Sequence, residues 1–458
     1  MSDKEFDGKY MSDVFLIEFP EHIKVFHKSN ISQGPKTQKE YSIFIHEYWH
    51  FLLNISTVVR FRDFSIWHHL IPVFSRALSK SEEFDNISEA ISDNDKKILE
   101  ETWDLMMTYN NDGFEGIQGK DYQDYKITGS AIYEPCDLSL FDKPIKFQKV
   151  KYPVEVQTEK GIEKGFLNIG NNAIDESIAN SVETIINPGK APSPLFLYQT
   201  LIKLSEFYNN GKRLTNYELA SIGTLSFLTT NPSASLENLF NDFISIKEKS
   251  NTDQAFKVIC DKIKPDFMQV ASVLLHDLQN IQEVYKGREP MEQAINYIAK
   301  KIKMAIHFRL SDLLFDLKPF VGSKLNQELL NHLTFKLIIP CDVKQAFNGP
   351  DDEINRDIIK SFDLNSIKLG ESYAYPSYLM QVLNCQMNYF RAHWALFTLV
   401  DSKNATSLCP YYTTCDLPDR TKNMEYCKTK PWKNYNQNKE NCMYGTAIST
   451  LKGLVKLK

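Results

Sequence analysis

The chain has 458 residues, of which 42% are hydrophobic and 24% charged, and its formal net charge is −5. These values are typical of a folded globular protein of two to four domains, and they argue against extended disorder and against a polyanionic or polycationic partner for the whole molecule. The chain contains no run of 18 apolar residues, and its polar first ten residues do not lead from a basic stretch into an apolar one. We therefore expect a cytoplasmic protein with no membrane segment.

The first predicted elements are an extended segment over Val14–Phe26 and a helix from Gln38 to about Ser56. Thr37 and Glu40 have the spacing of a capping box, in which each side chain accepts a hydrogen bond from a backbone N–H that the helix start leaves unpaired. No glycine or proline interrupts the segment that follows, and its middle is rich in apolar residues. A buried helix is the structure that this pattern predicts.

His46, Glu47 and His50 form an HExxH motif in the middle of that helix. Two histidines four residues apart share one helical face and can hold a single Zn²⁺, with the glutamate beside the metal. The motif predicts Glu47 as the catalytic base that activates a zinc-bound water. The alternative is a pair of core histidines held by hydrogen bonds. His68 and His69, on a second predicted helix, are the nearest candidates in sequence for an oxyanion donor, although packing or surface histidines are the interpretation we favour.

A β-hairpin is predicted ahead of the next helix, because Val154–Gln157 alternate in the manner of a strand and Phe166–Ile169 can pair with them. The polar loop between the two strands would contain Gly161 and Gly165. Such a hairpin could provide the edge strand along which an extended peptide binds beside a metal helix.

A helix that opens at Asn171 is predicted to carry the third zinc ligand. Its sequence from Asp175 to Asn180 is similar to the second metal helix of gluzincin, or thermolysin-like, metallopeptidases. This resemblance implies that Glu176 binds the metal and that Asn180 orients a metal-binding histidine. Asn180 replaces the carboxylate of the family pattern, and the gap from the HExxH motif is much longer than in the type enzymes. Glu183, two turns later, is the alternative ligand.

We predict an α+β, mainly helical fold in three parts. A zincin-like catalytic domain with a small sheet covers residues 1–190, a helical domain covers 191–400, and a basic, cysteine-rich tail covers 401–458. The helical periodicity of the second part predicts helices over the following ranges: Leu195–Tyr208, Asn216–Thr229, Leu236–Lys247, Thr252–Ile263, Phe267–Tyr285, Met291–Phe315 and Asn326–Leu337.

The tail holds four cysteines in 34 residues, namely Cys409, Cys415, Cys427 and Cys442. Their irregular spacing lacks the paired CxxC knuckles of a zinc ribbon, but the surrounding segment is too poor in apolar periodicity to fold unaided. A structural Zn²⁺ is one interpretation, an iron–sulfur cluster is a second, and free or disulfide-bonded cysteines are a third.

The sequence is compatible with three classes of function. The first is a zinc metallopeptidase acting on a protein or peptide substrate. The second is a zinc-containing binding protein that uses the basic tail, with aromatics such as Tyr411 and Tyr444, to engage a partner protein or nucleic acid. The third is a catalytically silent scaffold. Glu47 favours the first, because a structural zinc site needs no base between its histidines. The motif wording also resembles uncharacterised bacterial HEYxHF proteins and, more weakly, Lit-type peptidases of phage exclusion, which implies a defence or toxin-like protease.

Overall fold

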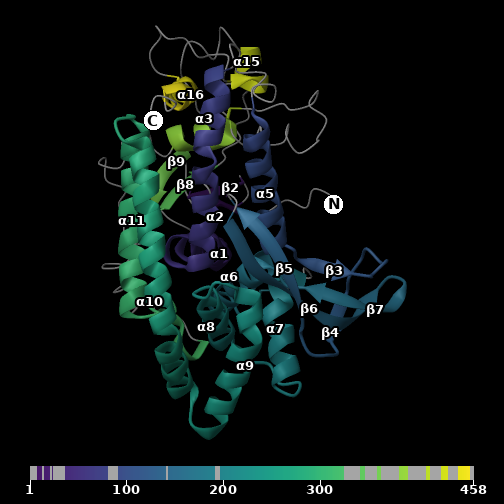
Figure 1. The fold of residues 1–458 in the computed structure, drawn as a ribbon. Helices are drawn as coiled ribbons and strands as arrows, with labels where there is room; N and C mark the ends of the chain where they lie inside the picture. The colour runs from purple at the N-terminus through teal and green to yellow at the C-terminus, as the bar shows by residue number, and fades with distance from the viewer. Residues whose placement is uncertain are drawn as a thin grey trace.

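The computed structural model is mainly helical with two small sheets (Figure 1). It describes residues 8–12, 15–20, 23, 37–80, 91–140, 143–190, 196–323, 341–345, 358–362, 381–389, 409–412, 424–431 and 442–453. The predicted α+β, mainly helical class is confirmed. None of the helices in these ranges combines the length and the hydrophobicity that crossing a bilayer requires. The buried core contains residues from all three predicted parts of the chain, and the domain boundaries stay a prediction.

The longer helices surround a central helix that carries the HExxH motif (Figure 1). That helix, α1, packs against α6 on one side and against α2 and α11 on others. The described helices have these bounds: α1 Gln38–Ser56, α2 Val58–His69, α3 Ile71–Lys80, α5 Asp93–Tyr109, α6 Asn171–Ile186, α7 Phe196–Tyr208, α8 Asn216–Ser226, α9 Pro232–Lys249, α10 Thr252–Tyr285, α11 Met291–Ser311, α15 Met424–Thr429 and α16 Met443–Gly453.

One sheet has the strand order β1-β2-β8-β9, formed by β1 Lys9–Met11, β2 Leu16–Phe19, β8 Cys341–Gln345 and β9 Ile358–Phe362. The β2–β8 pair is parallel and the other two pairs are antiparallel, so segments about 320 residues apart in the chain lie side by side. β1 is an edge strand of this sheet and contacts α1. This contact places the start of the described chain beside the HExxH helix.

The second sheet is antiparallel and contains β3 Gly113–Glu115, β4 Asp124–Ile127, β5 Ile132–Leu140, β6 Lys143–Thr158 and β7 Gly161–Asn168. It includes the predicted hairpin as β6 and β7. The predicted loop was too long, because Gly165 pairs with Val154 inside the ladder and only residues 159–160 form the turn. Figure 1 shows this sheet extending to one side of the helical body.

The HExxH helix starts as the sequence predicts. Thr37 accepts a hydrogen bond from the backbone of Glu40 over 3.1 Å, and the Glu40 carboxylate accepts one from the Thr37 backbone over 3.0 Å. From Ser42 to Ser56 every residue of the helix is buried. Because its whole circumference is covered, the polar groups in its middle have to be satisfied within the protein.

Two predicted helices, Thr252–Ile263 and Phe267–Tyr285, are one continuous helix, α10, with Pro265 inside it. A proline removes one backbone hydrogen bond and usually ends or kinks a helix. Here the apolar stripe continues through the proline at four-residue spacing, with Ile263, Phe267 and Ala271 all buried. Burial of this unbroken stripe explains why the helix persists. Of the other predicted helices, Asn326–Leu337 lies outside the described residues.

Two described parts of the tail, around Tyr411 and around Tyr444, pack onto the main core. Tyr411 is 2% exposed and Tyr444 1% exposed, and their hydroxyls are hydrogen-bonded to Asn384 and Asn388. These two rings are therefore inaccessible to a nucleic acid base. Helix α16, which carries Tyr444, contacts α3 from the first part of the chain.

His68 gives the stability of the protein a specific pH dependence. Burial lowers its pKa to about 3, against 6.5 for a solvated imidazole, and its Nδ1 lies 3.4 Å from the Tyr285 hydroxyl. Below pH 6.5 the unfolded chain binds a proton at this position that the folded chain does not, so stability falls as the pH falls from 6.5 towards 3.

His68→Phe is expected to remove this dependence. Between pH 7 and pH 5 the variant should lose about 2 kcal/mol less unfolding free energy than the parent chain, because each unit of pKa difference corresponds to about 1.4 kcal/mol. Urea unfolding at several pH values measures the difference. His307→Phe, at an exposed histidine, is the control. Parallel stability curves for the parent chain and His68→Phe would contradict the assignment.

Candidate metal centre

Three side chains from two helices meet at one point. His46 and His50 project from α1, and Glu176 projects from the second turn of α6, which packs against α1. The Glu176 Oε2 atom lies 3.3 Å from His46 Nε2 and 3.6 Å from His50 Nε2. Ligand atoms 2.0–2.1 Å from a tetrahedral zinc stand about 3.3 Å apart. Within the described residues, this is the one group of histidine, cysteine and acidic side chains close enough to hold a metal.

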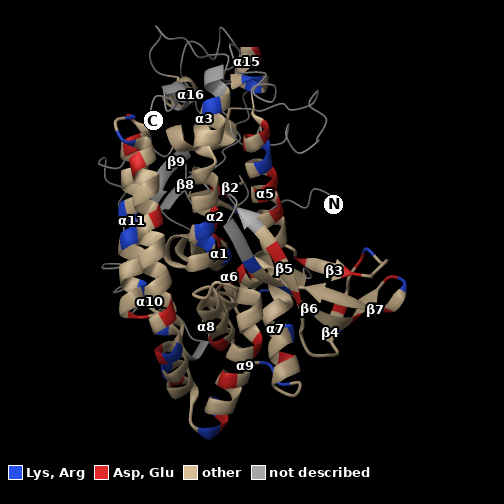
Figure 2. Cartoon of the chain, in the orientation of Figure 1, with Lys and Arg blue, Asp and Glu red and all other residues tan. Residues whose placement is uncertain are grey.

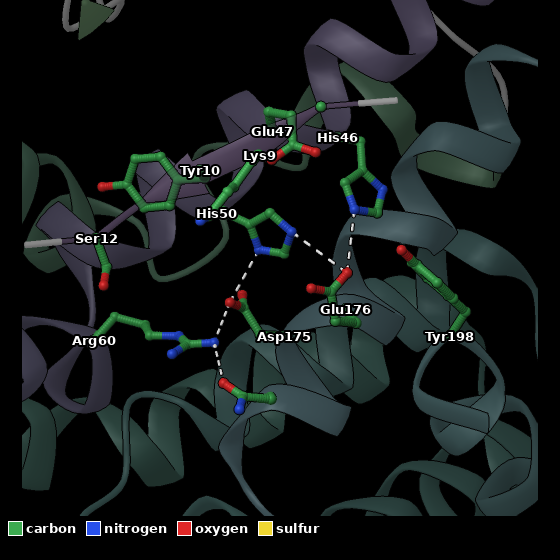
Figure 3. A pocket seen from close by; sticks show the side chains of 12 residues that line it. Lys9, Tyr10, Ser12, His46, Glu47, His50, Arg60, Asp175, Glu176 and Tyr198 are labelled. Carbon is green, nitrogen blue, oxygen red and sulfur yellow. Dashed lines mark hydrogen bonds and ion pairs between the residues drawn. The ribbon is translucent and has the colours of Figure 1, made fainter. Parts of the chain in front are cut away.

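Each histidine is held from behind by a second carboxylate. His46 Nδ1 lies 3.1 Å from Glu183 Oε2. His50 Nδ1 lies 2.9 Å from Asp175 Oδ2, a contact that Figure 3 shows. The Glu183 contact is a hydrogen bond and the Asp175 contact is within ion-pair distance, while Nε2 of both rings faces Glu176. Carboxylates in this position fix the orientation and tautomer of a metal-binding imidazole and raise its basicity.

Both of these carboxylates are paired in turn with a cation. Arg60 of α2 forms an ion pair with Asp175, and Lys190 forms one with Glu183. Behind each histidine, therefore, a carboxylate contacts the imidazole and a cation pairs with that carboxylate. The cations lower the cost of burying two carboxylates beside Glu176.

The structure corrects the role predicted for Asn180. Its amide donates to the Tyr198 carbonyl over 3.3 Å and its carbonyl oxygen accepts from Lys190 over 3.1 Å, so no described contact joins it to a histidine. Glu183, the alternative ligand, holds His46 at Nδ1 instead. At 3.6 residues per turn, Glu183 lies only about 20° around the helix from Glu176, whereas Asn180 is turned about 40° to the opposite side.

The electrostatics of the cluster favour a cation. Burial alone would lower the pKa of His46, but its contacts with Glu176 and Glu183 raise that pKa to about 9. Burial would raise the pKa of Glu176, yet the charges of His50 and His46 hold it well below its usual range. Without a metal, the nearby carboxylates therefore favour the protonated, positively charged form of the two histidines. A Zn²⁺ would replace those protons.

Glu47 lies beside the three ligands and is not one of them. Its side chain is 7% exposed, and burial raises its pKa. The backbone at Gly8 lies directly against it, because a Cβ atom at that position would be 2.9 Å from Glu47 Cγ and 3.0 Å from Phe19 Cε1. Only glycine fits there without displacing one of these side chains. The backbone just before β1 therefore packs directly against the candidate base.

The three ligands and Glu47 line a cavity of about 270 Å³ (Figure 3). β1 contributes Lys9 and Tyr10 to it, and α7 contributes Tyr198. Figure 3 shows the Tyr198 hydroxyl pointing towards His46 and Glu176. The β6–β7 hairpin contributes no lining residue, so the strand beside the cavity is β1 and the prediction of the hairpin as the neighbouring edge is corrected.

The other predicted site residues lie elsewhere. His68 is buried against Phe64 and Tyr285, and His69 contacts Asp277 over 2.7 Å, so both are packing or surface histidines. Cys409, Cys427 and Cys442 lie in the described part of the tail, where the backbone N–H of Cys409 donates to the Cys427 carbonyl over 3.0 Å. Cys415 lies outside the described residues. The metal, cluster and disulfide alternatives for the tail therefore stay predictions.

Sequence reasoning missed Lys9, Arg60, Asp175 as an orienting group, Lys190 and Tyr198. Asp175 is the one with a signal in the sequence, because it is an acidic residue directly next to the predicted ligand Glu176. The others depend on contacts between distant segments.

Comparison with known proteins gave no match to a protein-family model, a curated protein or a solved structure.

Proposed function

We propose that this protein is a zinc-dependent metallopeptidase that hydrolyses peptide bonds of a protein substrate. The observation that carries the proposal is the meeting of His46, His50 and Glu176, whose ligand atoms lie within 4.8 Å of one another, with a buried carboxylate, Glu47, beside them. Three protein ligands leave a fourth position for water, which is the donor set of a catalytic zinc site. The described positions of Tyr411 and Tyr444 weaken the alternative of a nucleic acid-binding tail.

The side chains divide the reaction among them. When bound, zinc would lower the pKa of a water molecule and polarise the scissile carbonyl. Glu47 accepts the proton of the attacking water and gives it to the leaving amine as the C–N bond breaks and the new C–O bond forms. Burial raises its pKa above that of a solvated glutamate, which makes the carboxylate a stronger base. The Tyr198 hydroxyl is placed to donate a hydrogen bond to the carbonyl oxygen as negative charge develops there.

Metal analysis combined with a cleavage assay tests the proposal. The purified chain should contain zinc at the HExxH site, and His46→Ala should lose it, while the exposed His307→Ala should keep it. Cleavage of unfolded protein substrates should disappear on chelation and return when zinc is added back. If His46→Ala leaves the zinc content unchanged, the proposed metal site is wrong. If zinc binds at His46 but no substrate in a broad peptide library is cleaved, the proposed peptidase activity is wrong.

A further inference from the structure

Lys9 is a cation of the cavity that has no counter-ion among the described residues. It lies on β1, its side chain is exposed, and it lines the same cavity as His46, His50 and Glu176. No described carboxylate is within ion-pair distance of it, whereas Arg60 is paired with both Asp63 and Asp175. Lys9 is thus available to a ligand in a way that Arg60 is not.

The local environment of Lys9, rather than the total charge of the cavity, favours a negatively charged ligand. The lining includes three carboxylates, from Glu47, Asp175 and Glu176, and two cations, from Lys9 and Arg60. With a bound Zn²⁺ and with Asp63, which pairs with Arg60, the formal charges balance. Lys9 is nevertheless the cation of the lining that has no described carboxylate beside it, so a ligand that carries a negative charge is favoured next to it.

The position of Lys9 defines where that negative charge would lie. In Figure 3, Lys9 and Arg60 stand on the His50 side of the site, while Tyr198 stands on the His46 side. A carbonyl placed at the metal with its oxygen towards Tyr198 therefore has its neighbouring groups near Lys9. The cavity of about 270 Å³ is large enough for a side chain or a chain end.

We propose that the site takes substrates with a carboxylate next to the scissile bond, and that Lys9 is the residue that selects them. The carboxylate comes either from an acidic side chain or from the carboxyl end of the substrate chain. This inference rests on the proposed function for its account of hydrolysis, but the binding preference of the zinc-loaded cavity can be measured without any cleavage.

Two small hydroxamates test the preference directly. Acetohydroxamate and the monohydroxamate of succinate share one metal-binding group and differ in a carboxylate. Calorimetry on the zinc-loaded protein should show about tenfold tighter binding of the succinate compound at low salt, since a charge-assisted contact at a cavity mouth is of that order. Lys9→Gln should abolish the difference and Lys9→Glu should reverse it. Lys249→Gln, at an exposed lysine on α9, is the control and should preserve it. Equal affinities in the parent chain, or a preference that survives Lys9→Gln, would overturn the proposal.

Peptides distinguish the two sources of the carboxylate. A set with aspartate or asparagine beside the scissile bond, each with a free or an amidated carboxyl end, is compared by kcat/KM. A preference for aspartate in both forms identifies the side chain, and a preference for the free end in both forms identifies the chain terminus. Cleavage without either preference overturns the selectivity. If no peptide is cleaved, the peptidase proposal fails, and the hydroxamate affinities still decide the role of Lys9.

Discussion

Replacing Glu47 by glutamine is expected to reduce hydrolysis about a thousandfold while zinc remains bound. The substitution keeps the size of the side chain and its packing against Gly8, but an amide cannot accept the proton of the attacking water. General acid–base catalysis contributes about 10²–10⁴ in rate, so the loss should fall in that range. The measurement is kcat on a cleaved peptide together with zinc content, determined on the same preparation.

Two further variants make the Glu47 result specific. Glu100→Gln, at an exposed position on α5, removes the same charge away from the cavity and should leave kcat unchanged. Glu47→Asp keeps the carboxylate but withdraws it by one methylene, and an intermediate rate is expected. Full activity of Glu47→Gln with zinc in place would show that the proton is taken by another group.

The second large effect concerns stability. Arg309 is completely buried and makes paired 2.7 Å contacts with both carboxylate oxygens of Asp316, and it also donates to Ser56 at the end of α1. Arg309→Met should lower the free energy of unfolding by about 3–5 kcal/mol, because the Asp316 carboxylate would remain buried without its partner. Urea denaturation followed by circular dichroism measures this loss.

The double variant Arg309→Met, Asp316→Leu removes both charges and so tests whether the loss in the single variant comes from the unpaired carboxylate. It should recover much of the lost stability, since replacing a buried ion pair by apolar side chains is often close to neutral. Lys262→Met is the control, because its contact with Asp242 is exposed and should contribute less than about 1 kcal/mol. A single Arg309→Met variant as stable as the parent chain would rule out this ion pair as a main support of the α1 and α11 packing.

The parts of the site that follow local rules could be predicted from the sequence. The capping box of Thr37 and Glu40 depends on residues three apart, and the shared face of His46 and His50 depends on the pitch of one helix. Glu176 required only that a second helix meet the first. The structure brings His46, His50 and Glu176 together.

The remaining parts depend on long-range contacts that no short pattern encodes. Strand β1 has three residues, and its place beside the cavity follows from pairing with β2, which pairs in turn with β8 far along the chain. Lys9 could not be assigned to the site without that pairing. Whether Asn180 or Glu183 meets His46 depends on the rotation of α6 against α1, which the hydrophobic stripe of α6 defines only to within a side chain or two.

The close contact between Gly8 and Glu47 also affects the conformational entropy that the Glu47 side chain would lose during the reaction. A glutamate side chain ordinarily samples many rotamers, and fixing it during the reaction opposes the rate. Here the Gly8 backbone, just before β1, packs against the Glu47 side chain and leaves little space beside it. The rotamer freedom of the base is thus already restricted when the chain folds, so that substrate binding does not have to restrict it.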